Sequence, residues 1–188
     1  EAGWATPKYN ALRDLIAKSV SYKVPEVPER IPVIAIPNIN LGKSVDVMTM
    51  INTMKAVESD HPMTFEELNQ GSGYVLYRRH FNQPISGLMR MKGLADYAVV
   101  YVNGEKKGEL NKVFDKDSME IDIPFNSTLD ILVENMGRIN YGARIVQSSK
   151  GITRPITIDD NEITGEWQMY PLPMASMPDT NRLPAGYK

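Results

Sequence analysis

Apolar residues recur at helical spacing near the start of the chain. Between Thr6 and Val20 the apolar positions are Tyr9, Leu12, Leu15 and Ile16, which predicts a short amphipathic helix. Thr6 can cap this helix, and Pro7 suits the first helical position. A proline-rich stretch then follows, with prolines at 25, 28, 32 and 37. Because proline lacks a backbone donor, we expect an extended connector or an edge strand there.

Further along, short segments with the alternation or β-branched content of strands replace the helical period. They are Tyr74–Phe81, Tyr97–Val102, Met119–Ile123 and Leu129–Val133, followed by the weaker candidates Ile152–Ile158 and Glu166–Tyr170. Asn103-Gly104 is a hairpin signal, because both residues tolerate a positive φ. Many short strands at close spacing predict a mainly β fold, an antiparallel sandwich or jelly roll.

Two segments depart from this pattern. Thr64 and Glu67 have the spacing of a capping box, which predicts a short helix after Thr64. In Lys43–Val57, Val45, Val47 and Thr49 alternate. The methionines of that segment fit a helix equally well, but the alternation favours a strand.

Composition narrows the classes of function. The 188 residues carry a formal net charge of -2, so we expect no nucleic-acid partner. No apolar run is long enough to cross a bilayer, so no membrane partner is predicted. Without cysteine there can be no disulfide or thiolate chemistry. The two histidines have no ligands at zinc spacing, and we predict no metal and no cofactor.

Five segments, in order, resemble one family. They are Glu1–Tyr9 with Leu12-Arg13, then Gly73–Arg78, Leu129–Gly142, Lys150–Ile152 and Trp167–Leu172. Together they resemble the end of the catalytic barrel and the following β domain of glycoside hydrolase family 35.

The resemblance implies a parent that hydrolyses terminal β-linked galactose with retention, using one carboxyl as acid/base and another as nucleophile. The family's acid/base motif, Asn-Glu-Tyr-Gly, is absent. We therefore predict no catalytic residue in this chain and no activity of the chain alone. The implied partners are the catalytic barrel and a further C-terminal β domain, with a galactoside as the candidate ligand. A periplasmic or secreted location is implied.

The same resemblance suggests an organisation in four parts. Residues 1–22 would be the last helix of a truncated barrel, and 23–42 a proline-rich connector. Residues 43–174 would form the galactose-binding-like β sandwich, and 175–188 a linker or tail.

The most recognisable stretch of the resemblance supplies the candidate motif. Glu134 and Arg138 could bind a sugar as a carboxylate and guanidinium pair, but an ion pair that fixes a turn is the favoured interpretation. Asn135 and Asn140 are expected to bond turn backbone. The full motif is Glu134, Asn135, Gly137, Arg138, Asn140, Tyr141 and Gly142.

Three aromatic residues, Trp4, Trp167 and Tyr170, could stack on a pyranose ring. Simple burial is the favoured alternative, because large aromatic residues dominate cores and interfaces. Trp4 could instead pack between barrel and sandwich.

Two functions remain to be separated. An accessory domain of a glycosidase should expose an apolar patch where the barrel docks. A carbohydrate-binding module that recognises galactosides should instead expose an aromatic platform beside Asn, Asp or Arg. A stand-alone enzyme is disfavoured, since no carboxylate pair can be named.

Overall fold

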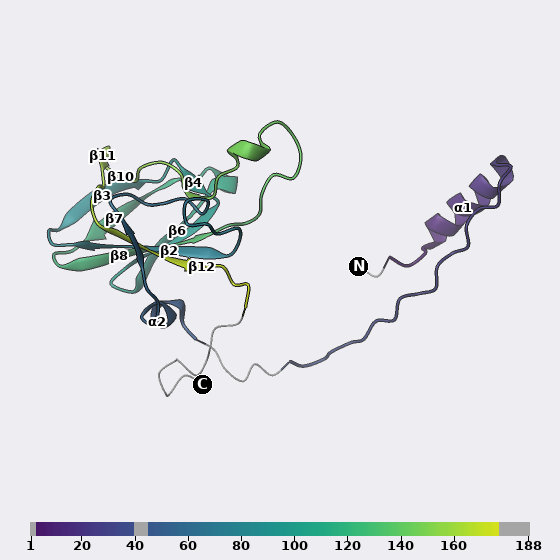
Figure 1. Cartoon of the computed structure of the whole chain (residues 1–188), viewed down its shortest axis with the longest axis horizontal. Coiled ribbons are helices and arrows are strands. Elements are labelled where there is room, and N and C mark those ends of the chain that lie inside the picture. Colours follow the sequence, from purple (N-terminus) through teal and green to yellow (C-terminus); the bar gives the residue numbers. More distant parts are fainter. Residues whose placement is uncertain (1–2, 40–44, 177–188) are drawn as a thin grey trace. The chain divides into compact units, whose positions relative to one another are not determined.

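The computed structural model describes residues 3–39 and 45–176 and divides the chain into two compact units, Glu1–Gly42 and Lys43–Lys188 (Figure 1). Most of the predicted tail, 175–188, lies outside the described residues. Among the described residues, no helix combines the length and the apolar character that a membrane span requires.

The first unit consists of one helix and an extended segment that returns beside it. Helix α1 spans Pro7–Ser19, and the Thr6 hydroxyl accepts a hydrogen bond from the Tyr9 backbone N–H at 3.2 Å. The predicted helix and its cap are therefore confirmed. Arg13 donates two hydrogen bonds, of 2.7 and 3.2 Å, to the carbonyl oxygen of Pro25. No residue of α1 is buried.

The second unit is built from antiparallel strands, which confirms the mainly β prediction. The six-stranded sheet has the order β1-β12-β2-β8-β5-β6, and the four-stranded sheet has the order β11-β10-β3-β7. The first contains β1 (Val57–Ser59), β12 (Trp167–Leu172), β2 (Tyr74–Phe81), β8 (Ser127–Glu134), β5 (Tyr97–Val102) and β6 (Glu105–Asn111). The second contains β11 (Asn161–Glu162), β10 (Thr157–Ile158), β3 (Ile85–Arg90) and β7 (Ser118–Ile123). A small pair joins β4 (Leu94–Ala95) to β9 (Gly151–Ile152).

One hydrophobic core is shared by the two larger sheets. It contains Val100 and Ile131 from the six-stranded sheet, and Met89 and Ile123 from the four-stranded sheet, all fully buried. Side chains from both sheets therefore face a common interior, as in a β sandwich. The finer assignment to a jelly roll or galactose-binding-like fold stays a prediction.

The strongest strand predictions agree with the structure. β2 has the predicted bounds, Tyr74–Phe81, and β5 the predicted bounds, Tyr97–Val102. Asn103 and Gly104, with φ of 51° and 79°, join β5 to β6 in the predicted hairpin. By contrast, the single strand predicted over Ile152–Ile158 is wrong. It is divided into β9 and β10, which lie in different sheets, and Pro155 between them has no N–H for a ladder.

The strand favoured for Lys43–Val57 is also wrong in its central part. Helix α2 spans Val47–Ile51, and the strand β1 begins only at Val57. Val47 and Ile51, one helical turn apart, pack with Leu76 and Tyr170 on the outer face of the six-stranded sheet. A helix suits this place because it can bury one apolar stripe while its other side faces solvent.

The short helix predicted after Thr64 is a run of turns instead. The capping-box bonds do form, since Glu67 N–H donates to the Thr64 hydroxyl at 3.2 Å and the Glu67 carboxylate accepts from Thr64 N–H at 2.7 Å. However, Asn69 has a φ of 57°, and Gln70 N–H donates to Phe65 carbonyl oxygen at 2.8 Å. This closure resembles a helix C-terminal motif, and it stops the chain from continuing as a helix after one turn.

Candidate interaction site

The loop of residues 135–150 joins β8 (Ser127–Glu134) to β9 (Gly151–Ile152) and contains most of the predicted motif. Figure 1 shows it in green, extending beyond the strands and carrying a short helical turn, η2 (Ile145–Gln147). Asn135 fixes its start: its side-chain amide donates to Gly71 carbonyl oxygen, and its Oδ1 accepts from Gly137 N–H, both at 3.0 Å. Both bonds of the Asn135 side chain are thus made to backbone atoms.

Arg138 anchors the middle of the loop, but its partner is not the predicted one. Its guanidinium forms an ion pair with Glu66, which lies 72 residues earlier in the chain, rather than with Glu134. It also donates to the carbonyl oxygens of Ser148 at 3.0 Å and Gly71 at 3.4 Å. Arg138 therefore ties both ends of the loop to the turn that contains Glu66.

Glu66 holds a second part of the same loop. Its other carboxylate oxygen accepts a hydrogen bond from the Lys150 backbone N–H at 3.0 Å. Burial alone would raise the pKa of Glu66, but the Lys150 N–H and the Arg138 guanidinium outweigh it and lower that pKa. Glu66 is therefore ionised at neutral pH, as both of its hydrogen bonds require.

A buried ion pair lies beneath the loop. The Lys150 ammonium lies 2.7 and 2.8 Å from the two carboxylate oxygens of Asp96, and the two side chains are only 7% and 13% exposed. Asp96 also accepts Met136 N–H at 3.0 Å through Oδ2. Sequence reasoning missed Glu66, Asp96 and Lys150 as a group, because no local spacing connects residues so far apart.

The Glu66–Arg138 and Asp96–Lys150 pairs, which we call the clamp, hold the loop, and several of the side chains that it exposes are apolar. Seven exposed apolar residues come from the loop and from the 3₁₀ helix η1 (Lys112–Phe114), and we call this set the apolar end: Val113, Phe114, Met136, Ile139, Tyr141, Ile145 and Val146. Tyr141 is 88% and Val146 is 90% exposed. Asp96 joins the two segments, because its carbonyl oxygen accepts Lys112 N–H while its carboxylate accepts Met136 N–H.

The remaining motif residues add little to the clamp. Glu134 ends β8, where its carbonyl oxygen accepts Asp96 N–H at 3.2 Å. Gly137 and Gly142, with φ of 112° and 107°, supply the backbone angles predicted for them. Asn140 is exposed. Its predicted hydrogen bond to turn backbone stays a prediction.

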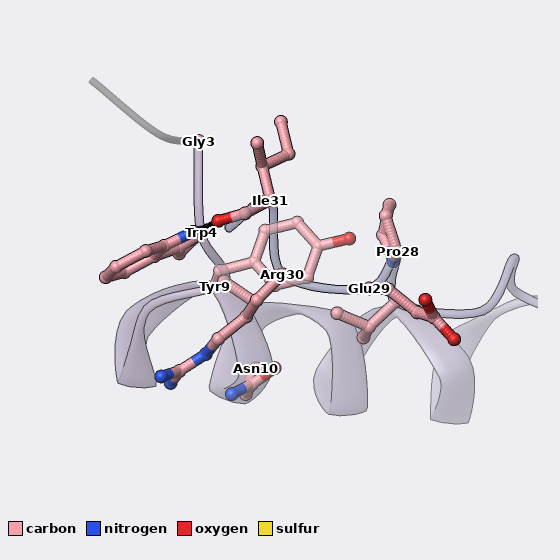
Figure 2. Close-up of a pocket in the computed structure, with 10 residues that line it drawn as sticks. Gly3, Trp4, Tyr9, Asn10, Pro28, Glu29, Arg30 and Ile31 are labelled. Carbon is pink, nitrogen blue, oxygen red and sulfur yellow. Dashed lines mark hydrogen bonds between the residues drawn. The ribbon is translucent and has the colours of Figure 1, made fainter. Parts of the chain in front are cut away.

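The three candidate stacking residues have separate environments. Trp167 is fully buried in the core, and Tyr170 is buried in the cluster under α2, so burial rather than stacking accounts for both. Trp4 lies in the first unit and donates its indole N–H to Ile31 carbonyl oxygen at 3.0 Å. Figure 2 shows the pocket that it lines with Tyr9 and Arg30, whose guanidinium lies 5.3 Å from the Trp4 ring centre. The role of Trp4 in packing against a barrel stays a prediction.

Taken together, the second unit is a mainly β domain in which two ion pairs hold a loop that exposes apolar side chains. Residues 62–173 match the model of the family described as beta-galactosidase, first all-beta domain. The chain belongs to this family.

Full-length relatives agree with this assignment. The chain is 37% identical over 183 residues to the beta-galactosidase of Xanthomonas manihotis, covering 97% of this chain and 30% of that protein. It is 37% identical to the Macaca fascicularis and 36% identical to the Homo sapiens beta-galactosidase, each over 92% of this chain and 26% of the relative. The chain thus spans less than a third of the length of these relatives.

Proposed function

We propose that these residues form the non-catalytic β domain of a β-galactosidase, whose catalytic carboxylates lie on another part of the polypeptide. The parent would hydrolyse terminal β-linked galactose by a retaining mechanism. Membership of the all-β family supports this assignment. So does the small share of each beta-galactosidase relative that the chain covers.

The observation that carries the proposal is the apolar end. Exposed apolar side chains are ordinary when scattered singly, but seven that come from one loop and from η1, two segments joined through Asp96, favour an interaction surface. Here the Asp96–Lys150 and Glu66–Arg138 ion pairs hold the loop against the rest of the domain. A loop that is rigid before binding loses less conformational entropy when it docks. We infer that the apolar end docks on the catalytic part and supports it.

The carboxyl groups give further support. A retaining glycosidase needs one carboxyl with a raised pKa to act as the acid. Among the residues that the structure describes, four carboxyls have a pKa that departs clearly from its ordinary value, and all four are lowered: Asp60 by hydrogen bonding to His61, Glu67 by the Thr64 N–H, Glu109 by Lys106, and Glu66 as described above. None of these four has the electrostatics of a general acid.

An activity assay of the purified chain tests the first half of the proposal. We expect no hydrolysis of a chromogenic β-galactoside above the buffer rate. Turnover that follows the chain through successive purification steps would overturn it. The reading frame upstream of Glu1 is an independent test, since it should encode a barrel with two glutamates at strand ends.

The second half of the proposal, docking through the apolar end, is tested in the longer polypeptide that carries these residues together with the catalytic part. Val146→Asp places a charge on the apolar end without touching the clamp, and should weaken domain docking and lower thermal stability of that protein. Glu120→Lys, an exposed change on β7, is the matched control. Equal effects of the two substitutions would contradict docking through the apolar end.

A further inference from the structure

The outer face of the six-stranded sheet is divided into an apolar half and a polar half. Toward the Tyr74 end of β2, Leu76, Leu132 and Tyr170 lie under α2. Toward the Phe81 end, the outward side chains are polar and surround an open pocket of about 660 Å³. That volume lies within the range of about 300–1,000 Å³ that is usual for small-ligand sites.

The pocket has a fixed floor. Arg78 of β2 donates from Nε and Nη2 to the two carboxylate oxygens of Asp130 on β8, at 2.7 and 3.0 Å. The Asp130 side chain is only 3% exposed. Arg78 also lies over the Tyr170 ring, 5.9 Å from its centre. The guanidinium is therefore held in one orientation, and its charge is balanced by its partner.

The pocket wall continues this hydrogen-bond network across two more strands. Tyr170 donates its hydroxyl to the Gln168 side-chain oxygen at 3.3 Å, and the Gln168 amide donates to Glu58 at 3.4 Å. On the other side, His80 and Thr128 line the pocket. The lining thus combines donors and acceptors, held in register by neighbouring strands.

The chemistry of the lining restricts the ligand. Glu58, Asp60 and Glu166 also line the pocket, so a phosphate or sulfate group would meet three carboxylates. Among the residues that the structure describes, no group of three or more His, Cys, Asp or Glu side chains could hold a metal ion. A hydroxyl group both donates and accepts, and so matches amide, carboxylate and guanidinium neighbours together.

We propose that this pocket binds a neutral, hydroxyl-rich ligand, a pyranose unit of a glycan chain. Trp167 contributes to the lining but is fully buried, so recognition depends on hydrogen bonds rather than on stacking. The pocket is made of different residues from the apolar end, and the proposal does not depend on the docking described above.

Titration of the isotope-labelled chain, followed by amide NMR shifts, tests the proposal. The probes are β-1,4-galactobiose, cellobiose and inorganic phosphate. We expect at least one disaccharide to shift amides of β1, β2, β8 and β12 around the pocket at millimolar concentration, and phosphate to shift none of them. No shift with either sugar, or shifts confined to another region, would overturn the proposal. A phosphate response at the pocket would overturn the choice of a neutral ligand.

Substitutions then locate the site. Gln168→Ala and His80→Ala should each weaken sugar binding at least about tenfold, a loss of about 1.4 kcal/mol. The matched control Glu120→Ala, on the other sheet, should leave the affinity unchanged. Each variant is used only if its amide spectrum keeps the dispersion of the unsubstituted chain. Undiminished binding by both pocket variants would contradict the assignment. Hydrolysis assays and docking are separate readouts, so this proposal and the proposed function can fail independently.

Discussion

The buried Asp96–Lys150 pair gives the most informative substitution in the molecule. Lys150→Met keeps most of the aliphatic length of the side chain but removes the ammonium, which contacts both carboxylate oxygens of Asp96. Removing one member of a buried pair leaves the other charge uncompensated, at a cost of about 3–5 kcal/mol. Asp96 would still accept Met136 N–H, so we expect a loss near the lower limit, about 3 kcal/mol.

Urea unfolding measures this loss. Trp167 is fully buried and reports on the core when Trp4 is replaced by phenylalanine in every variant. The matched control is Lys106→Met, which removes an ammonium from an ion pair with Glu109 whose side chains are 52% and 42% exposed. Exposed pairs contribute about 1 kcal/mol or less. The control should therefore lower the free energy of unfolding much less than Lys150→Met.

The double variant Asp96→Asn/Lys150→Met separates two explanations. If the single substitution destabilises because a charge is left buried, neutralising Asp96 as well should recover part of the loss. The reasoning is refuted if Lys150→Met costs no more than Lys106→Met, or if the double variant is as unstable as the sum of its single changes.

Three further predictions concern the clamp and the backbone beside it. The pKa of Glu66 is lowered in the folded state, so ionised Glu66 stabilises the fold fully above its ordinary pKa of 4.5. This contribution is lost as the pH falls through the lowered pKa. Urea unfolding should therefore show that the stability difference between the unsubstituted chain and Glu66→Gln shrinks below that pH. Gly151→Ala would put a Cβ 2.5 Å from the Tyr77 hydroxyl, whereas a Cβ at Gly104, also at positive φ, would meet nothing within 4 Å. Thermal unfolding should show a larger loss of stability for Gly151→Ala than for the control Gly104→Ala. Equal losses would contradict the close approach at Gly151. Arg138→Gln should speed chymotryptic cleavage of the loop while core unfolding changes by about 1 kcal/mol or less, and unchanged cleavage would argue against the clamp.

The local sequence pattern was sufficient to predict the elements whose position depends on residue type and spacing alone. The aromatic and β-branched residues of Tyr74–Phe81 were enough to place β2, in which Val75, Leu76 and Tyr77 are buried. Thr6 and Pro7 were enough to place the start of α1. The error at Val47–Ile51 had a tertiary cause, since alternation and a helical stripe cannot be separated over five residues without knowing which surface they cover.

The site could be predicted only in part, for a similar reason. The loop glycines and Asn135 make contacts within a few residues or use local backbone angles, and their roles follow from residue type. The partners of Arg138 and Lys150 lie 72 and 54 residues away in the sequence. No spacing rule links such residues. The sequence therefore indicated that charges fix the loop, but it named the wrong partner.

Hydrogen exchange of the loop tests the central claim most directly. Amides of residues 136–146 should exchange more slowly in the polypeptide that also carries the catalytic part than in the isolated chain, because docking covers the apolar end. Equal exchange of these amides in both proteins would contradict the claim that this surface supports a catalytic neighbour.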